Sequence, residues 1–225
     1  MHASPMIIKP TLTHALLKAE AKAFCEDMAG KTHPLLFGVT DGKAVGTYVE
    51  HLFEDYLRAR YRVQIGSSAK GIDLPGASVN TDIKVTSLQK PQSSCPFRTA
   101  AQKVYGLGYN LLVFVYEKIE QKRTCRLKFS HCAFIKSDRT GDYTLTKRLR
   151  EMVDDGANRE DILSLLVDRG LPGDDVTLGE LAERVLAKPP KQGYLTISNA
   201  FQWRLQYQHA IELKGSVAGI TNYEW

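Results

Sequence analysis

One run of six residues, 111–116, constrains the fold more than any other part of this sequence. It reads Leu-Leu-Val-Phe-Val-Tyr, so a strand formed here would carry apolar side chains on both faces. Such strands are typical of the centre of a sheet that is covered on both sides. The run is also much shorter than the roughly 20 residues that a membrane-spanning helix needs. It therefore predicts a buried central strand.

The segments around this run alternate between helical and extended patterns. We expect helices over 11–28, capped by Thr11 or Thr13, and over 43–60, followed by a strand over 79–87. A helix over 94–106 should precede the buried strand, and a strand over 126–135 should follow it after a charged turn at 117–123. This order predicts an α/β fold with a mixed central sheet flanked by helices.

The composition of the chain changes near Asp138. From 139 to 188 it is highly charged, and helical patterns run over 144–155, 159–169 and 177–187. We interpret this part as a small helical lobe, inserted in the fold or appended to it. Its acidic surface argues against contact with a polyanion and leaves a spacer, a dimer contact or a clamp as its role. The chain then divides into a core (1–138), the lobe (139–188) and a C-terminal segment (189–225) that returns to the core.

The overall composition is that of a globular protein, with 43% hydrophobic and 24% charged residues in a chain of 225. A net charge of +5 is compatible with a polyanionic partner but does not establish one. The four cysteines are widely spread and lack the spacing of a zinc site or a disulfide framework. The N-terminus does not resemble a signal peptide, so we expect a cytoplasmic protein with reduced thiols and no membrane association.

A candidate catalytic site lies on both sides of the Pro75-Gly76 turn. Asp82 and Lys84 stand two apart on the expected strand, so their side chains share one face. Asp73 can reach the same point if it lies on a neighbouring strand across the turn. Converging carboxylates repel each other unless a cation neutralises them, which favours a hard divalent metal. A lysine beside that metal can position a water or offset charge at a phosphate, as phosphodiester hydrolysis requires.

An Asp-x-Lys pair on a strand is also common as a solvated ion pair, so the surrounding residues matter. Glu50, on the preceding helix, could complete a metal shell, and Glu54 is its rival on the same helical face one turn later. The candidate catalytic residues are therefore Asp73, Asp82, Lys84 and Glu50. The candidate metal ligands are Asp73, Asp82 and Glu50, with Glu54 as the rival.

The order of these motifs resembles that of the PD-(D/E)XK nuclease superfamily. The amino-acid sequences of 70–75 and 82–87 are similar to those of type II restriction endonucleases. One departure is that Ile72, not proline, precedes Asp73. The resemblance implies a restriction-endonuclease-like fold and a bacterial, sequence-specific endonuclease that cuts double-stranded DNA. It also implies Mg²⁺ as cofactor, with Mn²⁺ able to substitute, and 5′-phosphate and 3′-hydroxyl ends. A homodimer and a cognate DNA methyltransferase are the partners that it implies.

Two polar segments could contact DNA, because amide and guanidinium groups read bases in the major groove. One follows the catalytic strand and the other lies in the C-terminal segment. In the tail, polar residues alternate with apolar ones over 201–208, which also fits a half-buried strand with a solvated face. The candidate DNA-binding residues are Gln89, Lys90, Gln92, Ser93, Ser94, Arg98, Lys191, Gln192, Asn199, Gln202 and Arg204.

Two other functions remain open from the sequence. One is a structure-specific or nicking repair or recombination nuclease of the same superfamily, which would not give discrete fragments from plasmid DNA. The other is a non-catalytic DNA-binding protein that retains the nuclease fold.

Overall fold

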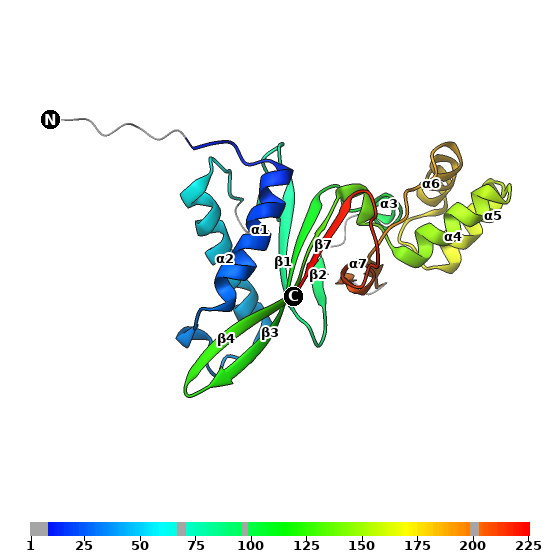
Figure 1. Ribbon diagram of the computed structural model, residues 1–225. Helices are drawn as coiled ribbons and strands as arrows, with labels where there is room; N and C mark the ends of the chain where they lie inside the picture. The colour runs from blue at the N-terminus through cyan, green and yellow to red at the C-terminus, as the bar shows by residue number, and fades with distance from the viewer. Residues whose placement is uncertain (1–8, 67–70, 96–98, 199–202) are drawn as a thin grey trace.

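The computed structural model describes residues 9–66, 71–95, 99–198 and 203–225 (Figure 1). Short 3₁₀ helices cover Pro34–Leu36 and Ser137–Arg139. The α-helices are α1 (His14–Ala29), α2 (Gly42–Arg60), α3 (Ala100–Tyr105), α4 (Tyr143–Asp154), α5 (Arg159–Asp168), α6 (Asp175–Ala187) and α7 (Gln208–Ile211). The strands are β1 (Thr81–Ser87), β2 (Gln92–Cys95), β3 (Asn110–Gln121), β4 (Thr124–Ile135), β5 (Thr196–Ile197), β6 (Trp203–Gln206) and β7 (Ile220–Glu224).

The main sheet of the described residues has the strand order β1-β3-β4-β7. β1 runs parallel to β3, whereas β3–β4 and β4–β7 are antiparallel, so the sheet is mixed. The apolar run 111–116 lies in β3 between two partner strands, and all its side chains are buried. The prediction of a buried central strand is therefore confirmed, and so is the mixed α/β fold with flanking helices.

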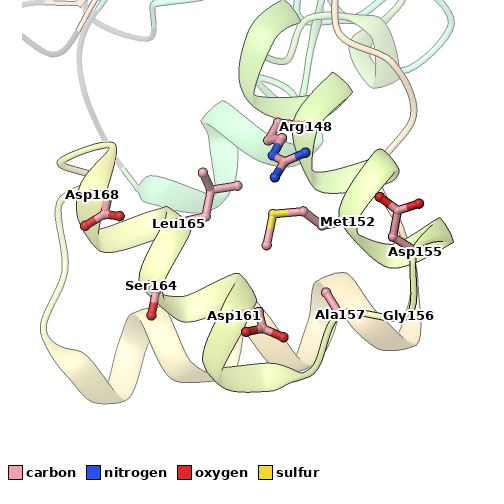
Figure 2. A pocket seen from close by; sticks show the side chains of 9 residues that line it. All are labelled: Arg148, Met152, Asp155, Gly156, Ala157, Asp161, Ser164, Leu165 and Asp168. Atoms are coloured by element: carbon pink, nitrogen blue, oxygen red, sulfur yellow. The ribbon is translucent and has the colours of Figure 1, made fainter.

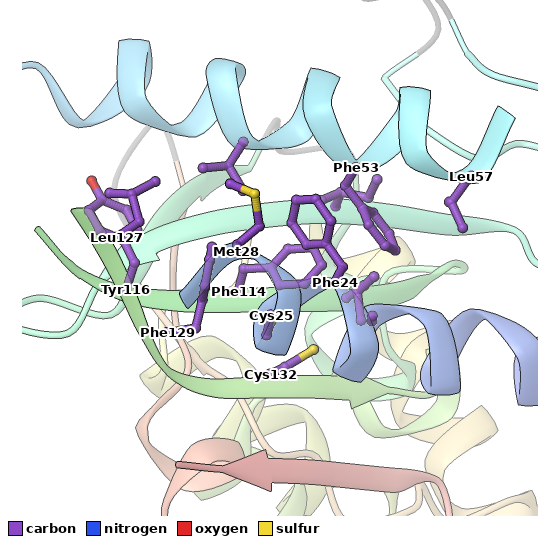
Figure 3. Close-up of a cluster of buried hydrophobic side chains, with 14 of the residues drawn as sticks. Phe24, Cys25, Met28, Phe53, Leu57, Phe114, Tyr116, Leu127, Phe129 and Cys132 are labelled. Atoms are coloured by element: carbon purple, nitrogen blue, oxygen red, sulfur yellow. The ribbon is translucent and has the colours of Figure 1, made fainter. Parts of the chain in front are cut away.

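Helices α1 and α2 cover one face of this sheet (Figures 1 and 3). Leu112 and Phe114 of β3 point to this face, where the Phe53 ring lies 5.0 Å from both Phe24 and Phe114, measured between centroids. Fully burying a large apolar side chain contributes about 1.5–3 kcal/mol. This aromatic cluster therefore fixes α2 on the sheet, and with it the acidic residues that α2 carries.

The opposite face of the main sheet is covered by a second, smaller sheet of order β2-β6-β5. Leu111 and Val113 of β3 pack with Ile197 and Leu205 of this small sheet and with Ala210 of α7. The expected half-buried strand in the tail is confirmed by β6, where Leu205 is buried between exposed neighbours. The C-terminal segment thus closes the second face of the core.

Helices α4, α5 and α6 form the charged part of the chain, close to the boundaries predicted from the sequence. Their apolar side chains pack together and against Ala100 and Val104 of α3. A pocket of about 500 Å³ lies in this part. The side chains that line it, drawn in Figure 2, include Asp155, Asp161 and Asp168 together with Arg148. The acidic side chains at this pocket would repel phosphate groups.

Two sequence predictions were wrong in detail. A helix was expected over 94–106, but Gln92–Cys95 is strand β2 and the helix is only Ala100–Tyr105. A turn was expected over 117–123, but β3 continues to Gln121 and only Lys122 and Arg123 form the turn, at φ 49° and 62°. In both places pairing with another strand overrides a polar local sequence.

The four cysteines are buried and form no disulfide within the described part of the chain. None of the helices described here combines the length and the apolar composition needed to span a bilayer.

Candidate active site

Asp82 and Lys84 lie side by side on β1, which is an edge strand of the main sheet. β1 pairs in parallel register with β3, which places Asp82 opposite Leu111 and Lys84 opposite Val113. The Lys84 Nζ is 2.7 Å from Oδ2 of Asp82, and Asp82 is only 3% exposed. The motif is therefore a largely buried ion pair and not a solvated one, so the chain holds a fixed carboxylate and a fixed ammonium at this edge.

Asp73 lies across a hairpin-like connection from Asp82, as the sequence suggested. Leu74 and Thr81 exchange two backbone hydrogen bonds, of 2.9 and 3.0 Å. Oδ2 of Asp73 accepts a hydrogen bond of 2.6 Å from the backbone N–H of Ile83. The Asp73 carboxylate is thus held against the part of β1 that carries the ion pair.

Gly66 supports Asp73 from the other side. Its N–H donates to the Asp73 carbonyl oxygen at 2.7 Å. A Cβ at this position would lie 2.0 Å from the carbonyl oxygen of Ile72, closer than real Cβ atoms come. Only glycine lets the two backbone segments approach this closely.

Helix α2 contributes the remaining carboxylates. Glu50 and Glu54 are one turn apart and face Asp73, and ligand atoms of these three residues all lie within 4.8 Å of one another. Glu54 is buried and its Oε2 is 3.7 Å from the Arg58 guanidinium. The sequence treated Glu54 as a rival of Glu50, but the structure brings both to Asp73.

The clustered carboxylates perturb the proton affinities of the site. Burial and the nearby Asp73 carboxylate raise the pKa of Glu50 to about 7. Burial also raises the pKa of Asp82 to about 7, although Lys84 opposes this shift. Burial alone would lower the pKa of Lys84, but Asp82 and the other carboxylates outweigh it and raise that pKa. Without a further cation the site holds more negative charge than Lys84 balances.

This donor set fits a hard divalent cation. Glu50, Glu54 and Asp73 offer only carboxylate oxygens, the ligands that Mg²⁺ and similar ions prefer. Asp82 and Lys84 are directly adjacent, since the Asp73 side chain bonds to the residue between them. The arrangement can hold a metal beside an ammonium that donates hydrogen bonds, which is what hydrolysis of a phosphodiester requires.

The candidate DNA-binding residues take several different positions. Gln89 and Lys90 are exposed in the turn after β1. Ser93 instead bonds to the buried Tyr207 hydroxyl. Lys191 is 2.6 Å from Asp138, and the Gln192 amide nitrogen lies within hydrogen-bond distance of three acceptors in the protein.

Gln92, Ser94 and Arg204 lie in paired strands of the small sheet. Arg98, Asn199 and Gln202 fall outside the described residues.

Comparison with known proteins identifies the family to which the chain belongs. A family model for the type II restriction enzyme NspV matches residues 11–222 of the chain. The type II restriction enzyme NspV of Nostoc sp. (strain ATCC 29411 / PCC 7524) is 47% identical over 211 residues, which cover 93% of this chain and 95% of that protein. No solved structure matches the chain.

Proposed function

The chain belongs to the family of the type II restriction enzyme NspV and is therefore a site-specific deoxyribonuclease. We propose that it cuts double-stranded DNA with Mg²⁺. The proposed active site consists of Asp73, Asp82, Lys84, Glu50 and Glu54. We also propose that the cut DNA strands carry a 5′-phosphate and a 3′-hydroxyl. The observation that carries it is the meeting of three carboxylates within 4.8 Å beside the Asp82–Lys84 ion pair.

Each residue has a separate task in this proposal. Glu50, Glu54 and Asp73 would hold the cation, and Asp82 would share that role from β1. When bound, Mg²⁺ supplies Lewis-acid polarisation of the scissile phosphate; Mn²⁺ could replace it. Lys84, held in place by Asp82, donates hydrogen bonds to the attacking water or to a phosphate oxygen, and so offsets the charge that develops there.

The partners follow from the chemistry of cutting both strands. A second copy of the chain would place a second active site on the opposite strand of a palindrome, so we propose a homodimer. A cognate DNA methyltransferase would protect the host's own sites. Gln89 and Lys90 would contact DNA beside the cut, and the acidic lobe (139–188) would lie away from it.

Digestion of a plasmid of known sequence tests the proposal. With Mg²⁺ we expect discrete fragments, and with EDTA intact plasmid. Sequencing the ends gives the cut position, and direct religation by a ligase without prior phosphorylation checks for 5′-phosphate and 3′-hydroxyl ends. Cleavage that persists in EDTA would overturn the metal assignment, and ends that cannot be religated would overturn the proposed end chemistry.

A further inference from the structure

The small sheet has one buried face and one outward face. Antiparallel pairing sets Ser93 opposite Leu205 and Cys95 opposite Trp203. Cys95 and Leu205 belong to the core against the main sheet, and Ser93 bonds to the buried Tyr207 hydroxyl. Directly paired residues in antiparallel strands share a face. Ser93, Cys95 and Leu205 therefore lie on the inward face, where the Ser93 hydroxyl is already bonded.

The outward face carries polar side chains only. Ser94 pairs with Arg204, and Gln92 pairs with Gln206, which also pairs with Thr196 of β5. Arg204 and Gln206 are exposed, and Gln92, Ser94 and Thr196 are half-buried. This face thus places two amides beside each other, next to a guanidinium and two hydroxyls.

Strand β2, which carries part of this outward face, is bonded directly to the catalytic strand. The Thr86 hydroxyl lies 3.0 Å from both the backbone nitrogen and the carbonyl oxygen of Gln92. Thr86 is two positions beyond Lys84, on the same face of β1, and two residues of a strand span about 7 Å. A duplex whose phosphate contacts Lys84 would therefore present its neighbouring base pairs to this sheet.

We propose that the outward face of β2 and β6 reads base edges in the major groove, with Gln206 and Gln92 recognising an adenine and Arg204 a guanine. A two-stranded β-ribbon fits the major groove, where amides pair with adenine N6 and N7 and guanidinium groups with guanine O6 and N7. The proposal rests on the proposed function and adds to it. It gives Gln206, one of the tail amides, a specific role in base reading, and it removes Ser93 from the residues that contact bases.

The test is cleavage of a random-sequence duplex library with Mg²⁺, followed by sequencing of the cut molecules. We compare the unaltered protein with Gln206→Ala, Gln206→Met and Arg204→Ala. Gln206→Met keeps the length of the side chain without its amide. Gln121→Ala is the matched control, because Gln121 is exposed at the far end of β3.

We expect Gln206→Ala and Gln206→Met to accept other bases at one adenine position, and Arg204→Ala at one guanine position. Cleavage of the original site should fall about 10- to 100-fold relative to Gln121→Ala. An unchanged site preference in the Gln206 variants would overturn the proposal. A uniform loss across all sequences with a shallower salt dependence would also overturn it, because that result indicates phosphate contact.

Thermal unfolding of each variant shows whether the fold is kept, and these exposed positions should leave the unfolding temperature unchanged. If the unaltered protein leaves the library uncut with Mg²⁺, the proposed function fails. If it cuts at one site and the variants share its preference, only the reading face fails.

Discussion

The Asp73 carboxylate lies 2.6 Å from the backbone nitrogen of Ile83, the residue between Asp82 and Lys84. Ile83 is buried in the core on the α1–α2 side of the sheet. One hydrogen bond therefore connects the packing of the core to the position of a carboxylate that also faces Glu50 and Glu54. The site depends on this register, because a shift of one residue would turn Asp82 and Lys84 to the opposite face.

Replacing Asp82 tests the assignment of the catalytic strand. We expect Asp82→Asn to lower Mg²⁺-supported cleavage by roughly 10²- to 10³-fold or more, because the carboxylate that holds Lys84 is lost. DNA binding, measured by gel shift, should persist. Asp27→Asn, at an exposed position on α1, is the control. Full cleavage by Asp82→Asn would remove Asp82 from the active site.

Replacing Glu54 tests whether it helps to hold the metal. We expect Glu54→Gln to raise the Mg²⁺ concentration for half-maximal cleavage roughly tenfold, because one of three clustered carboxylates is neutralised. The neighbouring Asp55 has a side chain that is 72% exposed, so Asp55→Asn is a matched control. An equal Mg²⁺ requirement in the two variants would place Glu54 outside the metal site.

Gly66 should tolerate no side chain. Because a Cβ would lie 2.0 Å from the Ile72 carbonyl oxygen, Gly66→Ala must displace the backbone at Asp73. We expect a loss of about 1–3 kcal/mol in the free energy of unfolding, measured with urea, together with reduced cleavage. Gly30→Ala is the control, since no atom lies within 4 Å of a Cβ there. Identical stability and cleavage in the two variants would show that the backbone at Asp73 can shift without loss of either.

His33 should contribute a loss of stability at mildly acidic pH. Burial lowers the pKa of this histidine below its ordinary 6.5, its Nδ1 lies 3.1 Å from the Tyr48 hydroxyl, and Nε2 has no hydrogen-bond partner among the described residues. A depressed folded pKa means that the unfolded chain binds the proton more readily. The contribution of His33 to the free energy of unfolding should therefore decrease as pH falls below about 6.5, by at most about 1.4 kcal/mol per pH unit. The raised pKa values of Glu50 and Asp82 act in the opposite direction, so the effect of His33 is the difference between variants.

Urea unfolding between pH 7 and 5 measures this slope. His33→Asn can keep the bond to Tyr48 but does not titrate, so it should lose less stability between pH 7 and 5 than the unaltered protein, whereas His51→Gln at an exposed position should leave the slope unchanged. Equal slopes in the unaltered protein and in His33→Asn would assign the effect to another group.

The sequence predicted those parts of the molecule that local patterns encode. The apolar run 111–116 gave the central strand, and the apolar stripe of 43–60 gave α2 with Glu50 on it. The Pro75-Gly76 turn gave the hairpin-like connection that sets Asp73 beside β1. In each case the signal lies within one short stretch of the sequence.

Strand β2 could not be predicted in this way. Gln-Ser-Ser-Cys lacks apolar alternation, and its extended form depends on pairing with β6 far along the chain. The part played by Glu54 was also open, because Glu50 and Glu54 share a helical face and only the position of Asp73 shows that both are within reach. Contacts between distant segments decide both points.

The hydrogen bond between Ser93 and Tyr207 joins residues 114 positions apart in the sequence. The β2–β6 surface is therefore assembled from two distant segments of the chain, and a point mutation changes only one of them. If this surface reads the bases, a change of one segment alone would leave a mismatched pair such as Gln92 and Gln206. New specificities in this family would then require coordinated substitutions in both segments, and exchanging a single block between relatives would not transfer them.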